Sequence, residues 1–345
     1  MMWLTWRQFR AQTLVAAAVL AVFAVILGVT GPHLASLYDG SGLATCHADG
    51  NCALLTRNFL AQMHSDPVYP AVFILGAGVL LLTPGLIGVF WGAPLVTREL
   101  EAGTFRLAWN QGVTRTRWMA VKLGLIGLAA MATAGLLSLM ITWWASPINR
   151  AGGFPVNLSQ LSRFSPVIFA TSGIAPIGYA AFAFAFAFGV TAGVLIRRTI
   201  PAMAVTLAVF AAVQIIIPHW VRPHLIPPAH ATSAISAGAF NNLRISSNGV
   251  MTVPASNMPG AWLISNQTLT PSGHAFVLPD TPACQSGTQQ QCNAWLASQH
   301  LRQQIAYQPA SRYWAFQWYE TAIFLALALA LAGFCLWWIR HRRLS

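Results

Sequence analysis

The chain alternates between long apolar stretches and polar segments in a way that is typical of membrane proteins. Six stretches are close to or longer than the ~20 residues with which an α-helix crosses a ~30 Å hydrocarbon core. They are residues 13–30, 72–96, 121–145, 167–196, 200–217 and 321–339. Apart from Lys122 near the start of the third stretch, none contains a charged side chain. The pattern predicts an all-α integral membrane protein with six transmembrane helices.

These stretches divide the chain into four parts. We expect a cytoplasmic interfacial helix at 1–12, spans one to five at 13–218 with a cytoplasmic coupling segment at 97–120, an extracellular loop at 219–315, and span six with a basic tail at 316–345. Turn-forming dipeptides in the long loop predict irregular structure with short elements. Within it, Cys292–Gln304 is expected to form one helix. The first span is expected to remain in the mature protein, because its apolar run is longer than that of a signal peptide.

Composition and charge agree with this division. The chain is 56% hydrophobic and 8% charged, which would leave a soluble domain covered with apolar surface. Arginines are dense in the short segments that would lie on the side of the N-terminus and sparse in the longer loops opposite. Because cytoplasmic loops carry the excess of basic residues, both termini are predicted to be cytoplasmic.

Cysteine positions give an independent indication of topology. Cys46 and Cys52 fall in the first outer loop, Cys284 and Cys292 in the last, and Cys335 in a span. An oxidising exterior suits this distribution. Pairing within each loop is the simplest of three connectivities, and zinc binding by the same four residues is a less favoured alternative.

The spans are poor in groups that could carry protons or ions. Glu320 is the nearest candidate, and beside Trp318 and Tyr319 it is expected to be a solvated carboxylate at the outer rim of the last span. A proton relay within the membrane is therefore disfavoured. The alternating Ala-Phe run at 181–188 is expected to be helical, since an isolated strand cannot satisfy its backbone in lipid. Its phenylalanines are expected to serve as lipid-facing and packing bulk.

Two pairs of glycines have the spacing that permits close helix approach. They are Gly88 with Gly92 and Gly189 with Gly193. By themselves they are a weak signal, because such spacing is common in spans. Pro84 is expected to kink the second span, and Pro176 to kink or split the fourth.

Motifs of catalysis and nucleotide binding are missing from the sequence. It contains no His-Glu-x-x-His, no Gly-x-Ser-x-Gly and no phosphate-binding Gly-x-x-x-x-Gly-Lys-Ser/Thr. His219, His224 and His230 are interpreted as surface loop histidines rather than metal ligands, because no acidic or cysteine partner lies near them in the sequence. We therefore expect no catalytic, metal or cofactor site in this chain.

The N-terminal segment has the pattern of an interfacial helix. Met2, Trp6 and Phe9 fall on one helical face, and Trp3 adds a further aromatic group. Trp3, Trp6 and Phe9 are the residues predicted to hold it at the cytoplasmic membrane surface. An equally acceptable interpretation is a simple anchor for the first span.

The segment between the second and third spans predicts a short helix presented to a partner protein. Arg98, Glu99 and Glu101 prolong the second helix into water, Gly103 ends it, Thr104 caps a helix of about two turns, and Thr114 caps the third span. A loop that only binds anionic lipid would explain the arginines but not this arrangement of caps. The predicted docking residues are Arg98, Glu99, Glu101, Thr104, Phe105, Arg106, Leu107, Trp109, Arg115 and Arg117.

At these residues the chain resembles the permease subunits of type-2 ATP-binding-cassette (ABC) exporters, in particular an actinobacterial subfamily. Arg98, Glu99, Gly103 and Thr104 match the Arg-Glu-x-x-x-Gly-Thr stretch that precedes their coupling helix. The resemblance extends to residues 197–204, 307–312 and 316–320 and so covers nearly the whole chain. It implies a pair of permeases, as a homodimer or with a related chain, and a separate ATPase subunit that binds ATP and Mg²⁺ and docks on the coupling and interfacial helices. The long last outer loop exceeds the minimal pattern of the family.

The sequence thus favours an exporter permease in a bacterial plasma membrane that moves a hydrophobic or amphipathic substrate, with drugs or antibiotics as one candidate class. Two alternatives remain open. One is a membrane-anchored sensor or scaffold with a ligand-binding ectodomain. The other, less favoured, is a membrane enzyme with an extracellular active site.

Overall fold

The computed structural model describes residues 2–46, 52–103, 114–151, 176–235, 240, 244–245, 251–253, 261–279, 281–285 and 287–341. The chain separates into two compact units. The first, here called the helical unit, comprises Met1–Asn157, Ser165–Arg222 and Trp314–Ser345. The second, here called the β unit, comprises Leu158–Phe164 and Pro223–Tyr313.

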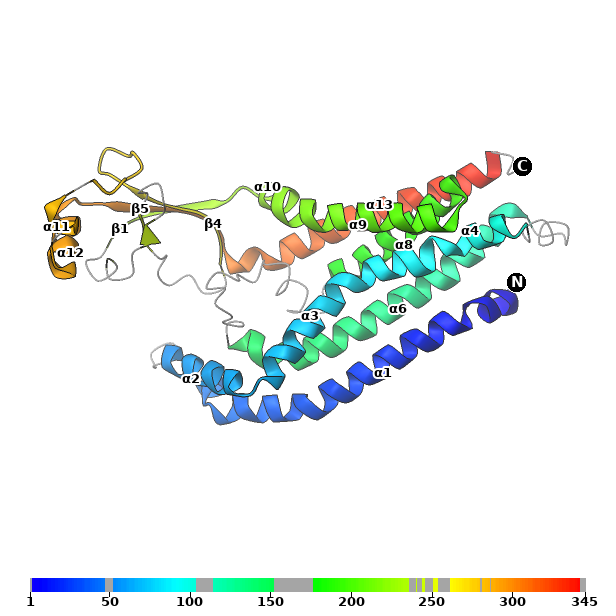
Figure 1. Cartoon of the computed structure of the whole chain (residues 1–345), viewed down its shortest axis with the longest axis horizontal. Coiled ribbons are helices and arrows are strands. Elements are labelled where there is room, and N and C mark those ends of the chain that lie inside the picture. The colour runs from blue at the N-terminus through cyan, green and yellow to red at the C-terminus, as the bar shows by residue number, and fades with distance from the viewer. Residues whose placement is uncertain are drawn as a thin grey trace. The chain divides into compact units, whose positions relative to one another are not determined.

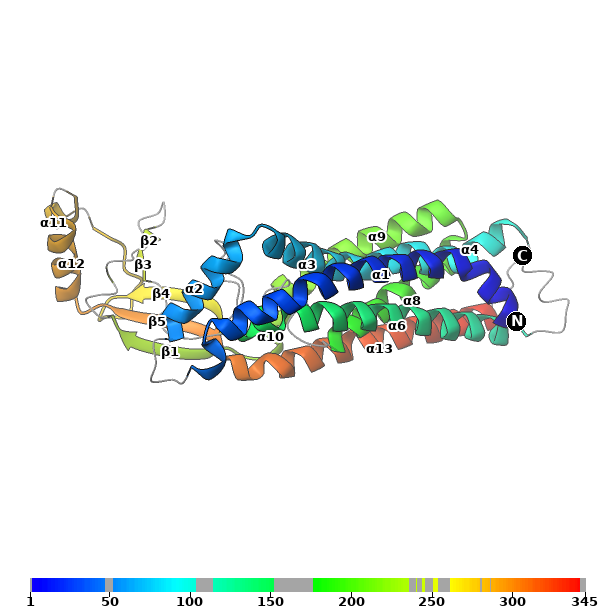
Figure 2. The ribbon, with the colours of Figure 1, turned by 90° about the horizontal axis from the view of Figure 1, so that it is seen from below.

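Long helices make up the described part of the helical unit (Figure 1). The elements are α1 (Met2–Gly40), η1 (Leu43–Thr45), α2 (Cys52–Ser65), α3 (Val68–Ile87), the π-helical turn η2 (Gly88–Gly92), α4 (Pro94–Glu101), α6 (Arg115–Arg150), α8 (Pro176–Ile196), α9 (Thr199–Ile216), the π-helical turn η3 (Ile217–Val221) and α13 (Tyr313–His341). Helix α10 (Arg222–Leu225) begins at the last residue of this unit and continues into the β unit. The start of α1, the end of α4, the start of α6 and the end of α13 lie at one end of this unit (Figures 1 and 2).

Five described helices are long and apolar enough to cross a membrane: Phe9–Gly40, Val68–Glu101, Thr116–Arg150, Thr199–Leu225 and Tyr313–His341. The protein is thus a multi-pass membrane protein. The expected fourth span corresponds to α8, which begins at Pro176 and whose apolar stretch Ala180–Ile196 is shorter. Residues 167–175 of that predicted span lie outside the described residues. The interfacial segment and the first span form one continuous helix, α1.

Local sequence signals set the ends of these helices. Thr114 caps α6 by accepting a hydrogen bond from the Arg117 N–H, as predicted. The second span continues through α4 to Glu101, and Gly103 follows with a φ of 67°. A left-handed residue just past a helix is the common place for glycine. The predicted end of this helix is therefore confirmed.

Helix α8 contacts α3, η2, α4, α6 and α9 and supplies much of the core of the helical unit. Phe182, Phe184 and Phe186 are buried in it. The prediction that the Ala-Phe run is helical is confirmed. Of the two roles expected for its phenylalanines, packing bulk is confirmed for these three and exposure to lipid is not, because neighbouring helices surround α8.

The two glycine pairs face each other where α8 meets η2 and α4. A Cβ atom on Gly92 would lie 2.6 Å from the Phe186 carbonyl oxygen, and one on Gly193 would lie 2.6 Å from the Ala93 carbonyl oxygen. A Cβ on Gly189 would clash with the Gly88 carbonyl oxygen. Backbones at this distance leave no room for any side chain, so these glycines are required by the packing.

The β unit contains a small antiparallel sheet, so the expected short elements are present, but here they form a regular sheet rather than irregular structure. Its strands are β1 (Ala229–Ala234), β5 (Arg302–Gln308) and β4 (Trp262–Leu269), in the order β1-β5-β4, with Ala231 and Asn266 both opposite Ile305. A second pair joins β2 (Arg244–Ile245) to β3 (Met251–Thr252), and the remaining elements are α11 (Pro282–Gln285), α12 (Gln289–Ser298) and η5 (Ala310–Arg312). The unit has a core of its own, made of Phe240, Met251, Val253, Phe276, Leu296 and Leu301.

The helix predicted at Cys292–Gln304 is correct only in its first half. α12 ends at Ser298, and His300 adopts a φ of 50°. Its backbone turns the chain out of the helix, so that Gln303 pairs with Ser233 of β1 and Thr268 of β4. Pairing with two strands distant in the sequence overrides the local helical pattern.

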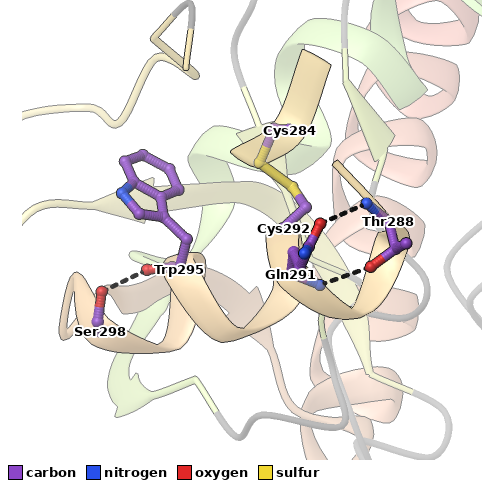
Figure 3. Close-up of a disulfide and its surroundings, with 6 residues drawn as sticks. All are labelled: Cys284, Thr288, Gln291, Cys292, Trp295 and Ser298. Atoms are coloured by element: carbon purple, nitrogen blue, oxygen red, sulfur yellow. Dashed lines mark hydrogen bonds between the residues drawn. A yellow bond between two sulfur atoms is a disulfide. The ribbon is translucent and has the colours of Figure 1, made fainter. Parts of the chain in front are cut away.

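Both predicted loop pairings of cysteine occur as disulfides, Cys46–Cys52 and Cys284–Cys292. The second links α11 to α12 beside a capping box in which Thr288 and Gln291 bond each other's backbone N–H groups (Figure 3). One turn further along α12, the Ser298 hydroxyl donates to the Trp295 carbonyl. The disulfide and the capping box together fix the start of α12.

Candidate functional site

The candidate site lies at the end of the helical unit where α4 stops and α6 begins. Between them are the predicted docking residues Thr104, Phe105, Arg106, Leu107 and Trp109, all outside the described residues. Arg115 is the first residue of α6, and Arg117 is exposed within its first turn. The structure therefore defines the two anchoring points of this segment, residues 97–103 and 114–122.

An ion pair holds these two anchoring points together. Lys122 Nζ lies 2.5 Å from Glu99 Oε1, and the two side chains are only 5% and 13% exposed. The ammonium also lies 4.6 Å from the centre of the Trp118 ring, a cation–π distance. Because an unpaired buried charge is strongly unfavourable, the pair fixes α4 against α6. The sequence places Glu99 among the docking residues and gives no signal of this pairing across 23 positions.

A second carboxylate joins α4 to α9. Glu101 Oε1 accepts the Thr199 N–H at 2.8 Å, and Glu101 Oε2 accepts the Thr199 hydroxyl at 2.7 Å. The same hydroxyl lies 2.8 Å from Thr97 Oγ1, which is fully buried one turn earlier on α4. Both oxygens of this predicted docking residue are thus engaged within the chain. The sequence did not point to Thr199, although it starts an apolar helix.

The first helix is also fastened to this end. Phe9 packs edge-on against Trp91, with ring centroids 4.8 Å apart. Gln12 Nε2 donates to the Phe90 carbonyl at 3.1 Å. This carbonyl lacks its usual helical partner, because Pro94 has no N–H. A pocket of about 190 Å³ remains between the helices, lined by Phe9, Gln12, Trp91, Pro94, Leu95, Arg98, Glu99 and Ile126. The side chains of Trp3 and Trp6 lie outside the described set.

The helical unit contains another buried ion pair, far along the sequence from this site. Arg222 donates to both carboxylate oxygens of Glu320, and the two side chains are 4% and 1% exposed. The prediction that Glu320 is solvated at the rim is wrong. Its sequence neighbours Trp318 and Tyr319 are exposed, but Glu320 lies on the opposite, buried side of α13. Arginine is suited to such burial because its planar fork bonds both oxygens of a carboxylate.

The two carboxylates at the end of α4 are engaged within the chain. Glu99 is paired with a lysine, and Glu101 accepts bonds from the first residue of α9. In the part of the chain that the structure describes, no group of three or more His, Cys, Asp and Glu residues could hold a metal ion. Three sets of contacts therefore hold the helices together at this end of the unit. They join α1 to η2, α4 to α6, and α4 to α9.

Comparison with known proteins places this site within a recognised family region. Residues 17–222 match the family described as ABC-2 membrane transporter related. The matched range includes Glu99, Glu101, Lys122 and Thr199, whereas Glu320 and most of the β unit lie beyond it. No curated protein and no solved structure matches the chain.

Proposed function

The chain belongs to the ABC-2 membrane transporter related family, and from this premise we propose that it is the permease subunit of an ATP-driven exporter in a bacterial plasma membrane. The proposal rests on the contacts that flank residues 104–113 within the matched region. Both ends of that segment are fixed to the bundle, by Glu99–Lys122 and by Glu101–Thr199. A segment held in this way can receive force from another protein and pass it to the helices.

The energy source is a partner subunit. The sequence has no phosphate-binding loop, so ATP and Mg²⁺ are bound by a separate ATPase. That ATPase docks on the coupling segment through Phe105, Leu107 and Trp109, with the arginines as a polar rim. The start of α1 lies at the same end of the helical unit and provides the neighbouring contact (Figures 1 and 2).

The transported substrate is hydrophobic or amphipathic, with drugs or antibiotics as candidates. The buried cores of the helical unit consist mainly of aromatic, aliphatic and small residues. The buried charges Arg222 and Glu320 neutralise each other. Two permease copies, identical or related, enclose the path, and both termini and the coupling segment are cytoplasmic. The resemblance of residues 97–104 and 197–204 supports assignment to the actinobacterial subfamily.

Co-purification tests the proposal. The chain is expressed with candidate nucleotide-binding proteins, and the complex is assayed for ATP hydrolysis. The intact chain is expected to capture one ATPase, whereas the chain alone binds no ATP. Phe105→Ala with Trp109→Ala should lower capture at least tenfold, because buried aromatic anchors commonly contribute ~2 kcal/mol or more each. Arg115→Ala with Arg117→Ala is the matched control and should have a smaller effect.

Two results would contradict the proposal. One is unchanged capture by the Phe105→Ala, Trp109→Ala chain, which would make the segment a lipid-facing loop. The other is ATP hydrolysis by the isolated, contaminant-free chain, which would place the nucleotide site in this polypeptide.

The folded β unit favours a second candidate, a sensor or scaffold with a ligand-binding ectodomain. This unit has its own core and disulfide, and most of it lies beyond the family-matched range. Replacing residues 227–309 by a short Gly-Ser linker distinguishes between the two candidate functions. A permease should still capture its ATPase, whereas a sensor should lose its ligand response and show no ATPase capture before or after the replacement.

A further inference from the structure

Helix α9 has no capping side chain at the residues next to its start. Arg198 occupies the N-cap position and makes no side-chain capping bond, and the first turn contains no acidic residue. The first N–H groups of a helix lack partners within the helix, and the helix dipole places partial positive charge there. A helix that starts this way needs an acceptor from elsewhere.

Glu101 supplies that acceptor from the last residue of α4. Its carboxylate takes both the N–H and the hydroxyl of Thr199, at 2.8 and 2.7 Å. A negative group at this position satisfies a free N–H and complements the dipole. Capping is usually performed by a residue next to the helix, but here 98 positions separate donor and acceptor. The cap is therefore also a connection between two helices.

The packing around the cap is close and leaves little freedom. Thr97 donates to the Ala93 carbonyl at 3.0 Å and contacts the Thr199 hydroxyl. A Cβ on Gly193 of α8 would lie 2.6 Å from that same carbonyl oxygen. Arg197, which joins α8 to α9, adopts a φ of 59°, a conformation that non-glycine residues seldom take. The turn between α8 and α9 is thus fitted tightly against the end of α4.

We infer that Glu101 is a positioning residue: it transmits a displacement of residues 102–114 to helix α9. The inference rests on the proposed function, since the displacement comes from the partner ATPase. Force on the segment enters the last turn of α4, which Glu99 fastens to α6 and Glu101 fastens to α9. Loss of the Glu99–Lys122 pair would loosen the link to α6, whereas loss of the Glu101 cap would remove the carboxylate link between α4 and the start of α9.

The first arm of the test uses the full chain alone and measures amide hydrogen exchange at residues 197–203. Glu101→Ala should accelerate exchange at the start of α9 at least tenfold, because the acceptor of the Thr199 N–H is gone. Thr206→Val is the matched control, since its hydroxyl donates to the Ala202 carbonyl of the same helix. Unchanged exchange in Glu101→Ala would overturn the inference.

The second arm uses the chain with its ATPase and a reporter cysteine at Ile216, the last residue of α9, in a Cys335→Ala background. In the wild-type chain, Mg-ATP should change maleimide labelling of this cysteine at least threefold. Glu101→Ala, which removes both bonds, should abolish the change while the ATPase remains bound and active. Thr199→Val, which loses the hydroxyl bond and keeps the N–H bond, should reduce it. Thr206→Val should retain it, and Thr199→Ser should restore it because the hydroxyl is kept.

The outcomes separate this inference from the proposed function. If no ATPase binds the wild-type chain, the proposed function has failed and the inference falls with it. If the ATPase binds and labelling responds to ATP in every variant, only the inference is overturned. If Glu101→Ala releases the ATPase while Thr199→Val keeps both binding and the full labelling change, Glu101 contacts the partner rather than driving α9, which also overturns it.

Discussion

Arg222 and Glu320 form a buried ion pair that connects the two chain segments flanking the β unit. Arg222 Nη2 lies 2.9 Å from Glu320 Oε2, its Nε bonds the other oxygen, and 98 positions separate the residues. Arg222 is the last residue of the helical unit before Pro223–Tyr313, and Glu320 lies in the second turn of α13. The pair therefore joins the segment at which the chain leaves the helical unit to the segment at which it re-enters that unit.

Removing one partner of this pair should cost far more than removing both. Glu320→Leu leaves the Arg222 guanidinium buried without its carboxylate, which should lower the free energy of unfolding by ~3–5 kcal/mol. Arg222→Met combined with Glu320→Leu should be close to the wild type, because the charges are exchanged for apolar volume. Thermal unfolding of the purified chain in detergent measures both. Equal losses in the single and double variants would contradict this prediction.

The glycine crossing of α8 with η2 and α4 should tolerate no side chain. Gly193→Ala places a methyl group 2.6 Å from the Ala93 carbonyl oxygen, so the helices must separate. Overpacking of this kind costs ~1–3 kcal/mol. Gly333→Ala, which meets nothing within 4 Å, is the control and should leave the unfolding temperature unchanged or slightly raised. The prediction fails if the two variants unfold at the same temperature.

The Cys284–Cys292 disulfide should stabilise the β unit selectively. Replacing both cysteines by serine frees a short loop in the unfolded chain, and the chain-entropy relation gives a loss of ~2–3 kcal/mol. Limited proteolysis should then cleave residues 262–308 faster, while the helical unit remains resistant. Cys335→Ala, in the helical unit, is the control. Non-reducing peptide mapping that recovered free thiols at Cys284 and Cys292 would contradict the assignment.

Both termini and the coupling segment are predicted to be cytoplasmic, and the long loop extracellular. A cysteine introduced at Asn248 should react with a membrane-impermeant reagent in intact cells, whereas one at Asn110 should react only after permeabilisation. The expectation follows from the distribution of arginines. The reverse labelling pattern would overturn the topology.

The sequence was sufficient wherever neighbouring residues decide the structure. Thr114 caps α6 because its hydroxyl reaches an N–H three residues ahead, and Gly103 ends the preceding helix because a positive φ costs glycine little. The disulfide Cys284–Cys292 closes within eight positions. Apolar runs of span length identified five helices for the same reason, since the backbone must satisfy itself within each segment.

Only the tertiary structure decided what these helices bring together. Periodicity could not show that Glu101 caps a helix 98 positions away, or that Glu320 turns inward to Arg222 rather than outward with Trp318. It also could not predict the β unit, where β5 is a strand because β1 and β4 supply its backbone partners. A carboxylate is equally compatible with solvent, a lysine or a helix N-terminus. Which partner it meets depends on how the helices pack, because pairing energies act between groups close in space and take no account of distance along the chain.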